Sequence, residues 1–165
     1  MVRTATSRAQ TARRVAGEVA DPEVPVLTIA DLGVLRDVEV TDDGRVVVTI
    51  TPTYSGCPAM DTIRTDVVDA LRRNGFADVE VRTVLSPAWT TDWMTEEGKR
   101  RLAEYGIAPP GRRRAGGAVP VTLSVRCPHC GSLDTRELSH FGSTACKALW
   151  QCRACSEPFD HFKAI

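Results

Sequence analysis

The chain has 165 residues, 42% of them apolar, and its 21 basic and 21 acidic side chains give a formal net charge of +0. This length suits one domain of about 100 residues plus a small appendage. No overall charge would draw it to nucleic acid or an anionic membrane. No apolar run reaches the roughly 18 residues that span a bilayer, and residues 1–20 lack the apolar core of a secretory signal. We therefore expect a cytoplasmic protein with no membrane partner. Because the cytoplasm is reducing, we interpret the cysteines as metal ligands or nucleophiles in preference to disulfide partners.

A helix and a hairpin are predicted first. Ser7 and Gln10 form a capping-box pattern, and the apolar residues that follow at helical spacing predict a helix to about residue 20. The stretch "DPEVP" stops this helix, because residues before proline disfavour the helical region. Two β-rich runs within residues 34–53 then flank Asp43-Gly44, which is a strong turn signal.

A second helix and a third strand complete the first domain. Residues 60–75 place apolar side chains on one helical stripe and end in Asn74-Gly75, a left-handed stop. Residues 78–85 alternate as a strand does, and residues 95–106 predict a short, highly charged helix. This order of elements predicts an α+β domain over residues 7–107, with a small mixed sheet and helices on one side of it.

Proline, glycine and arginine then dominate, and we predict a linker over residues 108–117. Its three consecutive arginines, Arg112 to Arg114, are candidates for phosphate contact, but an isolated charge run is more often a solvated connector. A separate module follows over residues 118–165.

Four cysteines of this module form two Cys-x-x-Cys pairs: Cys127, Cys130, Cys152 and Cys155. A module this short rarely buries enough apolar surface to stay folded, so it needs an additional cross-link such as a bound metal ion. Two such pairs can close a tetrahedral four-sulfur site, and soft thiolates favour zinc or iron. Because protein ligands fill all four positions, we interpret the site as a structural zinc ribbon in preference to a redox iron or iron–sulfur centre.

Other side chains of the module leave a second function open. Cys146 lies outside the pairs and is interpreted as a small buried residue, with a spare ligand or reactive thiol as the alternative. His140 and His161 lack a partner at ligand spacing and are interpreted as surface histidines. Aromatic and basic side chains could stack bases and meet phosphates, but nearby acidic residues nearly cancel the charge. The same aromatics serve equally well as a small core plus a protein-docking face. The side chains concerned are Phe141, Trp150, Phe159, Phe162, Arg126, Lys147, Arg153 and Lys163.

Cys57 lies where the predicted second strand meets the second helix. Pro58 suits the first helical turn, which sets the Cys57 sulfur near free backbone N–H groups and the positive end of the helix dipole. We therefore predict a stabilised thiolate with a lowered pKa, fit to attack an acyl carbon or to hold iron or an iron–sulfur species transiently. The alternative is an ordinary half-buried cysteine at a helix start.

The surroundings of Cys57 limit its chemistry. No histidine occurs before His129, so the general base of a cysteine hydrolase is missing and a covalent enzyme is disfavoured. Asp21 and Glu23 are candidates to lie close to Cys57, or merely to terminate the first helix.

Several of these stretches resemble a known family. "DPEVPVLTIADLGVLRDVEV", "VTITPTYSGCPAMDTIRTDV" and "VLSPAWTTDWMTEEGKRRL" resemble the small metal–sulfur cluster assembly proteins of the SufT-like group. With the cysteine-rich tail added, the whole chain resembles the PaaD family of the phenylacetyl-CoA oxygenase, or epoxidase, system. The resemblance implies an accessory protein of aerobic phenylacetate catabolism that assists assembly of an iron–sulfur or iron centre. The alternative is a stoichiometric, non-catalytic subunit of the oxygenase.

The resemblance also implies roles for residues and partners. Cys57 corresponds to the favoured iron or cluster contact, Asp21 and Glu23 to an acidic element, and the four paired cysteines to metal ligands. The implied partners are the oxygenase components, especially the iron–sulfur reductase. Because clusters usually take four protein ligands, a homodimer mate, the client or a small thiol would have to supply what Cys57 cannot.

Overall fold

In a computed structural model, which describes residues 2–111 and 124–165, the chain divides into two compact units. The first comprises Met1–Trp89 and Trp93–Thr95, and the second comprises Thr90–Asp92 and Glu96–Ile165. None of the helices in the described ranges is long and apolar enough to cross a lipid bilayer. The predicted linker arginines, Arg112 to Arg114, lie outside the described residues.

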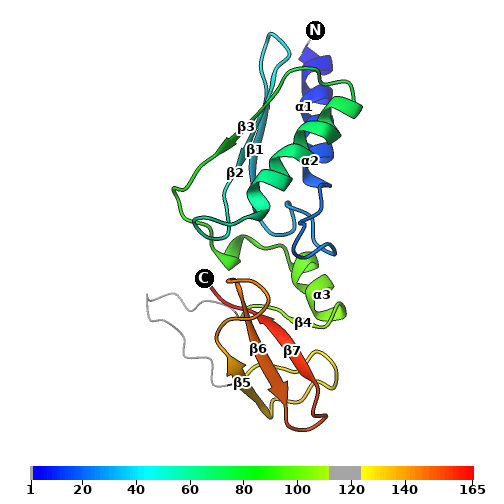
Figure 1. Ribbon diagram of the computed structural model, residues 1–165. Helices are drawn as coiled ribbons and strands as arrows, with labels where there is room; N and C mark the ends of the chain where they lie inside the picture. Colours follow the sequence, from blue (N-terminus) through cyan, green and yellow to red (C-terminus); the bar gives the residue numbers. More distant parts are fainter. Residues whose placement is uncertain (1, 112–123) are drawn as a thin grey trace. The chain divides into compact units, whose positions relative to one another are not determined.

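The first unit is built on a mixed sheet with the strand order β1-β2-β3 (Figure 1). Strands β1 (Leu35–Val40) and β2 (Val46–Ile50) pair antiparallel, as the Asp43-Gly44 signal predicted. Strand β3 (Val79–Thr83) pairs in parallel with β2, so the carboxyl ends of β2 and β3 meet at one edge of the sheet. The predicted α+β fold with a small mixed sheet is confirmed.

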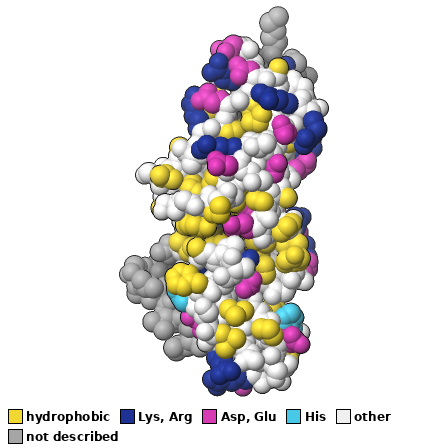
Figure 2. Space-filling view, in the orientation of Figure 1, with side chains coloured by type: hydrophobic (Ala, Val, Ile, Leu, Met, Phe, Trp, Pro, Cys, Tyr) yellow, Lys and Arg dark blue, Asp and Glu magenta, His cyan; other side chains and the backbone are white. Residues whose placement is uncertain are grey.

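Two helices, α1 (Val2–Gly17) and α2 (Ala59–Arg73), pack beside this sheet (Figure 1). The apolar stripe of α2 is buried, and most β2 side chains are also excluded from water. The fully buried residues are Val46, Val48, Ile50, Ile63, Val67 and Leu71. Acidic and basic side chains intermingle over the outer surface of this unit (Figure 2). Burial of the stripe is what holds the helix on the sheet, since most helical stability comes from packing of an amphipathic face.

The predicted end of α2 agrees with the structure, whereas the predicted start of α1 does not. Gly75 adopts φ +85°, so the predicted left-handed stop after α2 is confirmed. Helix α1 begins at Val2, so the predicted start at a Ser7 capping box is wrong. Ser7 lies within the helix, where its carbonyl accepts a hydrogen bond from the Thr11 hydroxyl at 2.9 Å.

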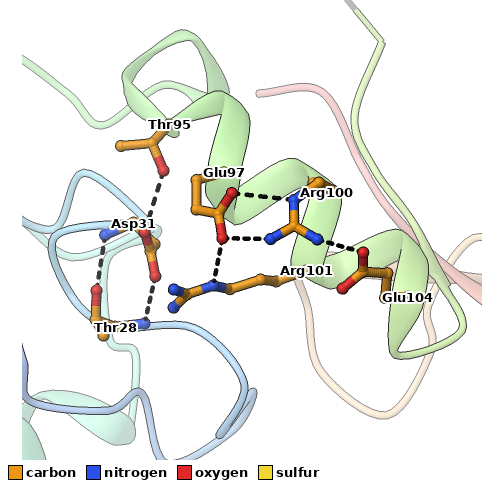
Figure 3. Close-up of polar contacts among 7 residues, drawn as sticks. All are labelled: Thr28, Asp31, Thr95, Glu97, Arg100, Arg101 and Glu104. Carbon is orange, nitrogen blue, oxygen red and sulfur yellow. Dashed lines mark hydrogen bonds and ion pairs between the residues drawn. The ribbon is translucent and has the colours of Figure 1, made fainter.

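An ordered loop joins α1 to β1. The Asp31 carboxylate accepts hydrogen bonds from the Thr28 backbone N–H and the Thr95 hydroxyl, each at 3.2 Å (Figure 3). The Trp89 indole N–H donates to the Leu32 carbonyl at 2.9 Å. Gly33 adopts φ +72°, and a Cβ there would lie 2.5 Å from the carbonyl oxygen of Trp93. Only glycine fits this position, both in conformation and in space.

The second unit contains a four-stranded sheet in the order β4-β7-β6-β5. Its strands are β4 (Ile107–Ala108), β5 (Thr135–Ser139), β6 (Lys147–Cys152) and β7 (Pro158–Phe162). The sequence patterns place the end of the first domain at residue 107 and the start of a linker at residue 108. In the structure Ala108 pairs in parallel with His161, so β4 forms an edge of the second unit's sheet.

Helix α3 (Glu96–Glu104) belongs to the same unit as β4. Its surface carries a ladder in which Glu97 accepts from Arg100 and Arg101, and Arg100 also pairs with Glu104 (Figure 3). The spacing of these pairs is one helical turn, which is where oppositely charged side chains support an isolated helix. Beyond stabilising a short helix, this exposed ladder has no evident role.

Candidate functional site

The four paired cysteines converge in the second unit. Cys127 and Cys130 lie in the turn before β5, Cys152 ends β6, and Cys155 lies in the turn that leads to β7. Their sulfur atoms all lie within 4.8 Å of one another. Cys127 and Cys155 approach to 3.8 Å between sulfurs, and Cys130 and Cys152 to 3.5 Å.

Local backbone geometry sets the first pair in place. The Cys127 N–H donates to the Ser132 carbonyl and the Gly131 N–H donates to the Cys127 carbonyl, both at 2.9 Å. Gly131 adopts φ +77°, which turns the chain sharply enough for both sulfurs to face the same point. On the other side, the Cys152 N–H donates to the Glu157 carbonyl at 3.0 Å and closes the second turn.

This arrangement fits a tetrahedral metal ion. Zinc–sulfur bonds are about 2.3 Å long, which places the sulfurs of a tetrahedral site about 3.8 Å apart. The observed sulfur separations of 3.5 and 3.8 Å agree with this value. The backbone N–H of Cys155 donates to the Cys152 sulfur and lowers the pKa of that thiol to about 7. Burial and the neighbouring cysteine sulfurs raise the pKa of Cys155 to about 12, so metal binding has to displace protons from the cluster. The four-cysteine cluster could hold a metal ion, and four protein ligands would leave no coordination position for a substrate.

The other predicted candidates of this unit do not join the cluster. Cys146 is buried, as predicted, and its sulfur lies 3.0 Å from the Thr144 hydroxyl. The prediction of a surface histidine at position 161 is wrong, because His161 is buried and its ring meets that of Trp150 edge to face at 5.9 Å. Burial lowers the pKa of His161 to about 4, with a smaller contribution from the Lys163 charge, so this histidine is neutral at pH 7.

Most of the side chains that could have stacked bases are internal. Trp150, Phe159 and Phe162 are each at most 4% exposed, and Lys147 is buried as well. Of the four aromatic residues considered, only Phe141 reaches the surface. Trp150, Phe159 and Phe162 therefore belong to the core of the second unit, and a nucleic-acid interface built on them is disfavoured.

In the first unit, Cys57 lies half-buried in the loop between β2 and α2. Pro58 is the N-cap of α2, and the Cys57 carbonyl accepts from the Met60 N–H at 3.3 Å. The backbone N–H of Ala59 donates to the Cys57 sulfur. The predicted contact of this thiol with the amino end of the helix is present.

The prediction of a lowered pKa is nevertheless wrong, because the pKa of the Cys57 thiol is raised. Burial is the largest cause. The Ala59 N–H and the Thr53 hydroxyl donate to the sulfur and oppose the rise, while the negative charges of Glu23 and Asp21 add to it. The thiol is therefore protonated at neutral pH, and capture of a metal ion by its sulfur has to release a proton.

Asp21 and Glu23 act on Cys57 electrostatically, as the sequence suggested they could. Asp21 is buried, and its carboxylate accepts from the backbone N–H groups of Glu23 at 2.9 Å and Val24 at 2.8 Å. Helix α1 ends at Gly17, so neither acid terminates it. Within residues 2–111 and 124–165, Cys57, Asp21 and Glu23 are not close enough together to form a metal cluster by themselves.

The sequence analysis missed Thr53. Its hydroxyl reaches the Cys57 sulfur because the strand-to-helix loop turns back on itself, with the Cys57 N–H donating to the Tyr54 carbonyl at 3.3 Å and Gly56 at φ +85°. A Thr-Pro-Thr sequence before a Cys-Pro pair was visible, but only the turn brings the hydroxyl to the sulfur.

Comparison with known proteins identifies both halves of the chain. Residues 10–84 match a family described as iron–sulfur cluster assembly protein, and residues 114–163 match the PaaD zinc beta ribbon domain. An Escherichia coli protein, named as a putative subunit of 1,2-phenylacetyl-CoA epoxidase, is 51% identical over 148 residues, which covers 90% of this chain and 88% of that protein.

Further relatives match the first unit. The Bacillus subtilis Fe-S protein maturation auxiliary factor YitW is 39% identical over 86 residues, covering 52% of this chain and 83% of that protein. A crystal structure of a domain of unknown function, DUF59, from Bacillus anthracis superimposes with a TM-score of 0.57 at 28% identity, covering 62% of this chain and 97% of that one. The chain therefore belongs to the PaaD family, in which an iron–sulfur cluster assembly domain of the SufT-like group is joined to a zinc ribbon.

Proposed function

We propose that this chain is an accessory maturation protein for a multicomponent phenylacetyl-CoA epoxidase, and that it assists assembly of an iron–sulfur or iron centre in that enzyme. The observation that carries the proposal is the presence, in one chain, of an iron–sulfur assembly domain and the PaaD ribbon, with 90% of the chain matching a relative named as an epoxidase subunit. No histidine occurs before His129, so the first domain lacks the general base that a cysteine hydrolase needs, and a covalent enzyme is disfavoured.

The two cysteine sites take different parts in this role. The four sulfurs of the ribbon hold zinc as a structural ion, since a closed site of four thiolates contributes to folding and offers no open position. Cys57 is the contact for the cargo, which is iron or an iron–sulfur species bound only during transfer. Its protonated thiol gives up its proton as the iron binds, and Glu23 and Asp21 lie close enough for their charges to act on the sulfur.

One thiolate cannot retain a cluster unaided, because clusters usually take four protein ligands. The remaining ligands come from the client, from a small thiol or from a second copy of the chain. A site with a single protein sulfur is consequently suited to transfer, whereas a site with four is suited to retention. The client we propose is the iron–sulfur reductase of the epoxidase system.

The test replaces Cys57 by serine in cells that grow on phenylacetate. We expect the epoxidase components purified from the Cys57→Ser strain to contain less iron and to show less epoxidase activity than those from the wild-type strain. Ser55→Ala is the matched control, because Ser55 is an exposed residue of the same loop. Normal iron content and activity with Cys57→Ser would remove Cys57 from the mechanism.

A second candidate is a stoichiometric, non-catalytic subunit of the epoxidase, which the name of the Escherichia coli relative favours. A subunit co-purifies with the assembled enzyme at a fixed ratio, whereas a maturation factor leaves once the centre is built. Measurement of the chain's stoichiometry in the active, purified enzyme separates the two.

A further inference from the structure

An exposed aromatic residue lies at the tip of the hairpin formed by β5 and β6. The Phe141 side chain is 67% exposed, and Leu138, at the end of β5, is 47% exposed. Hydrophobic side chains reach the surface of the second unit among charged ones (Figure 2). A phenylalanine in water forgoes the stabilisation that its burial would bring, and burial of this ring against a partner would recover it.

The loop that carries Phe141 is fixed by hydrogen bonds on both sides of this residue. The Ser139 hydroxyl donates to the Phe141 carbonyl at 2.8 Å and accepts from the Phe141 N–H at 3.3 Å. The Gly142 N–H donates to the Lys147 carbonyl at 2.7 Å. A Cβ at Gly142 would lie 3.1 Å from an Asp160 carboxylate oxygen, so the loop lies tightly against the sheet.

The aromatic ring is itself held in one orientation. The His140 ring meets it edge to face at 5.4 Å, and the Lys163 ammonium lies 4.7 Å from its centroid. The same ammonium donates to the His140 carbonyl at 3.0 Å. An anchor ordered before binding loses little conformational entropy on association, which favours affinity.

The charges around the ring indicate what kind of partner fits. The Lys163 ammonium contacts a carbonyl and an aromatic ring, and among the described residues it has no carboxylate partner. The carboxylate of Glu137, an acidic residue of the hairpin, lies 3.5 Å from the Nδ1 atom of His140. A partner that places a carboxylate beside Lys163 and an apolar pocket around Phe141 would satisfy both features.

We propose that Phe141 and Lys163 form a docking surface, the hairpin-tip surface, for the iron–sulfur reductase component of the phenylacetyl-CoA epoxidase system. The matching surface on that component is an apolar pocket edged by carboxylates. This inference rests on the proposed function, because it takes its partner from it. Phe141 supplies the buried anchor, and Lys163 supplies orientation and part of the rate of encounter.

The test measures binding of the full, metal-loaded chain to the iron–sulfur reductase component, purified from cells that lack this chain. We expect Phe141→Ala to weaken binding by about tenfold or more, as truncation of an aromatic anchor does. Tyr105→Ala is the matched control, since Tyr105 is an aromatic residue of the same unit that is 58% exposed and lies outside the hairpin tip. Lys163→Gln should weaken binding and reduce its dependence on salt.

Each outcome decides the matter. Binding lost with Phe141→Ala and kept with Tyr105→Ala, at equal metal content, supports the surface. Equal affinities of Phe141→Ala and the wild type would overturn it while leaving the Cys57 test of the proposed function untouched. Equal losses with both variants would overturn it as well, because the effect would not be local. No binding by the wild-type chain would overturn both this inference and the proposed role of the reductase as client.

Discussion

Replacement of Gly33 by alanine should destabilise the first unit strongly. Gly33 adopts φ +72°, and the added Cβ would lie 2.5 Å from the Trp93 carbonyl oxygen and 2.6 Å from the Trp93 Cβ. The left-handed conformation costs a non-glycine residue about 1–2 kcal/mol. Forcing an extra carbon into a packed contact costs about 1–3 kcal/mol more. We therefore expect a loss of about 2–5 kcal/mol in the free energy of unfolding.

Gly44→Ala is the control that separates the two costs. Gly44 also has a positive φ, of +87°, but a Cβ there meets nothing within 4 Å. Its substitution should cost only the conformational part, about 1–2 kcal/mol. Urea unfolding followed by circular dichroism measures the free energy of unfolding of both variants. Thermal unfolding measures Tm, which should fall by roughly 10 °C or more in Gly33→Ala, at about 4–8 °C per kcal/mol for a domain of this size.

The result bears on the site as well as on the fold. Gly33 ends the loop that carries Asp21 and Glu23, so displacing it should also disturb the charges that act on Cys57. If Gly33→Ala proved no more destabilising than Gly44→Ala, the close approach of this loop to Trp93 would be refuted.

Three further predictions concern titration and metal. Glu23→Gln removes a charge that raises the pKa of Cys57, so the pH profile of Cys57 alkylation by iodoacetamide should move to lower pH; an unmoved profile would contradict the assigned cause. The pKa of His161, about 4, lies below the value of about 6.5 for an unfolded histidine, so the unfolded state binds the proton first. His161 should thus contribute its full stabilisation above about pH 6.5, and the second unit should lose at most about 1.4 kcal/mol per pH unit from this group as the pH falls towards about 4. The loss that urea unfolding measures over this range should be smaller for His161→Gln, in which this group no longer titrates. Chelation of the ribbon ion should release one metal per chain and unfold the second unit, as the loss of Trp150 near-ultraviolet dichroism would report, because structural zinc contributes about 10–16 kcal/mol to such folds.

Sequence signals predicted those structural elements whose conformation depends on residues close together in the chain. The Asp43-Gly44 turn specified the β1–β2 hairpin, and the apolar period over residues 60–75 specified α2. The spacing of the cysteine pairs brought their four sulfurs together, since each pair sits in a short turn. In each of these cases the residues that determine the structure are neighbours along the chain.

Features that depend on distant residues were not predictable in the same way. Strand β4 is two residues long and pairs with β7 from the far end of the sequence, so no periodic pattern marks it. The prediction of a lowered pKa for Cys57 was wrong for a related reason. The helix end, which is local, favours the thiolate, but burial and the charges of Glu23 and Asp21 arise only from the tertiary fold and outweigh it.

The raised pKa of Cys57 has a consequence for how a maturation factor would work. A thiol that is protonated in the resting chain competes poorly for free metal ions, because the ion must displace the proton. Binding becomes favourable when other ligands for the same iron arrive together with it, as they do when a client approaches. The proposed transfer therefore depends on contact between proteins, and the chain needs a surface that holds the client while ligands exchange. Accordingly, a variant that loses the Phe141 anchor should fail to support epoxidase activity even though its Cys57 alkylates at the wild-type rate.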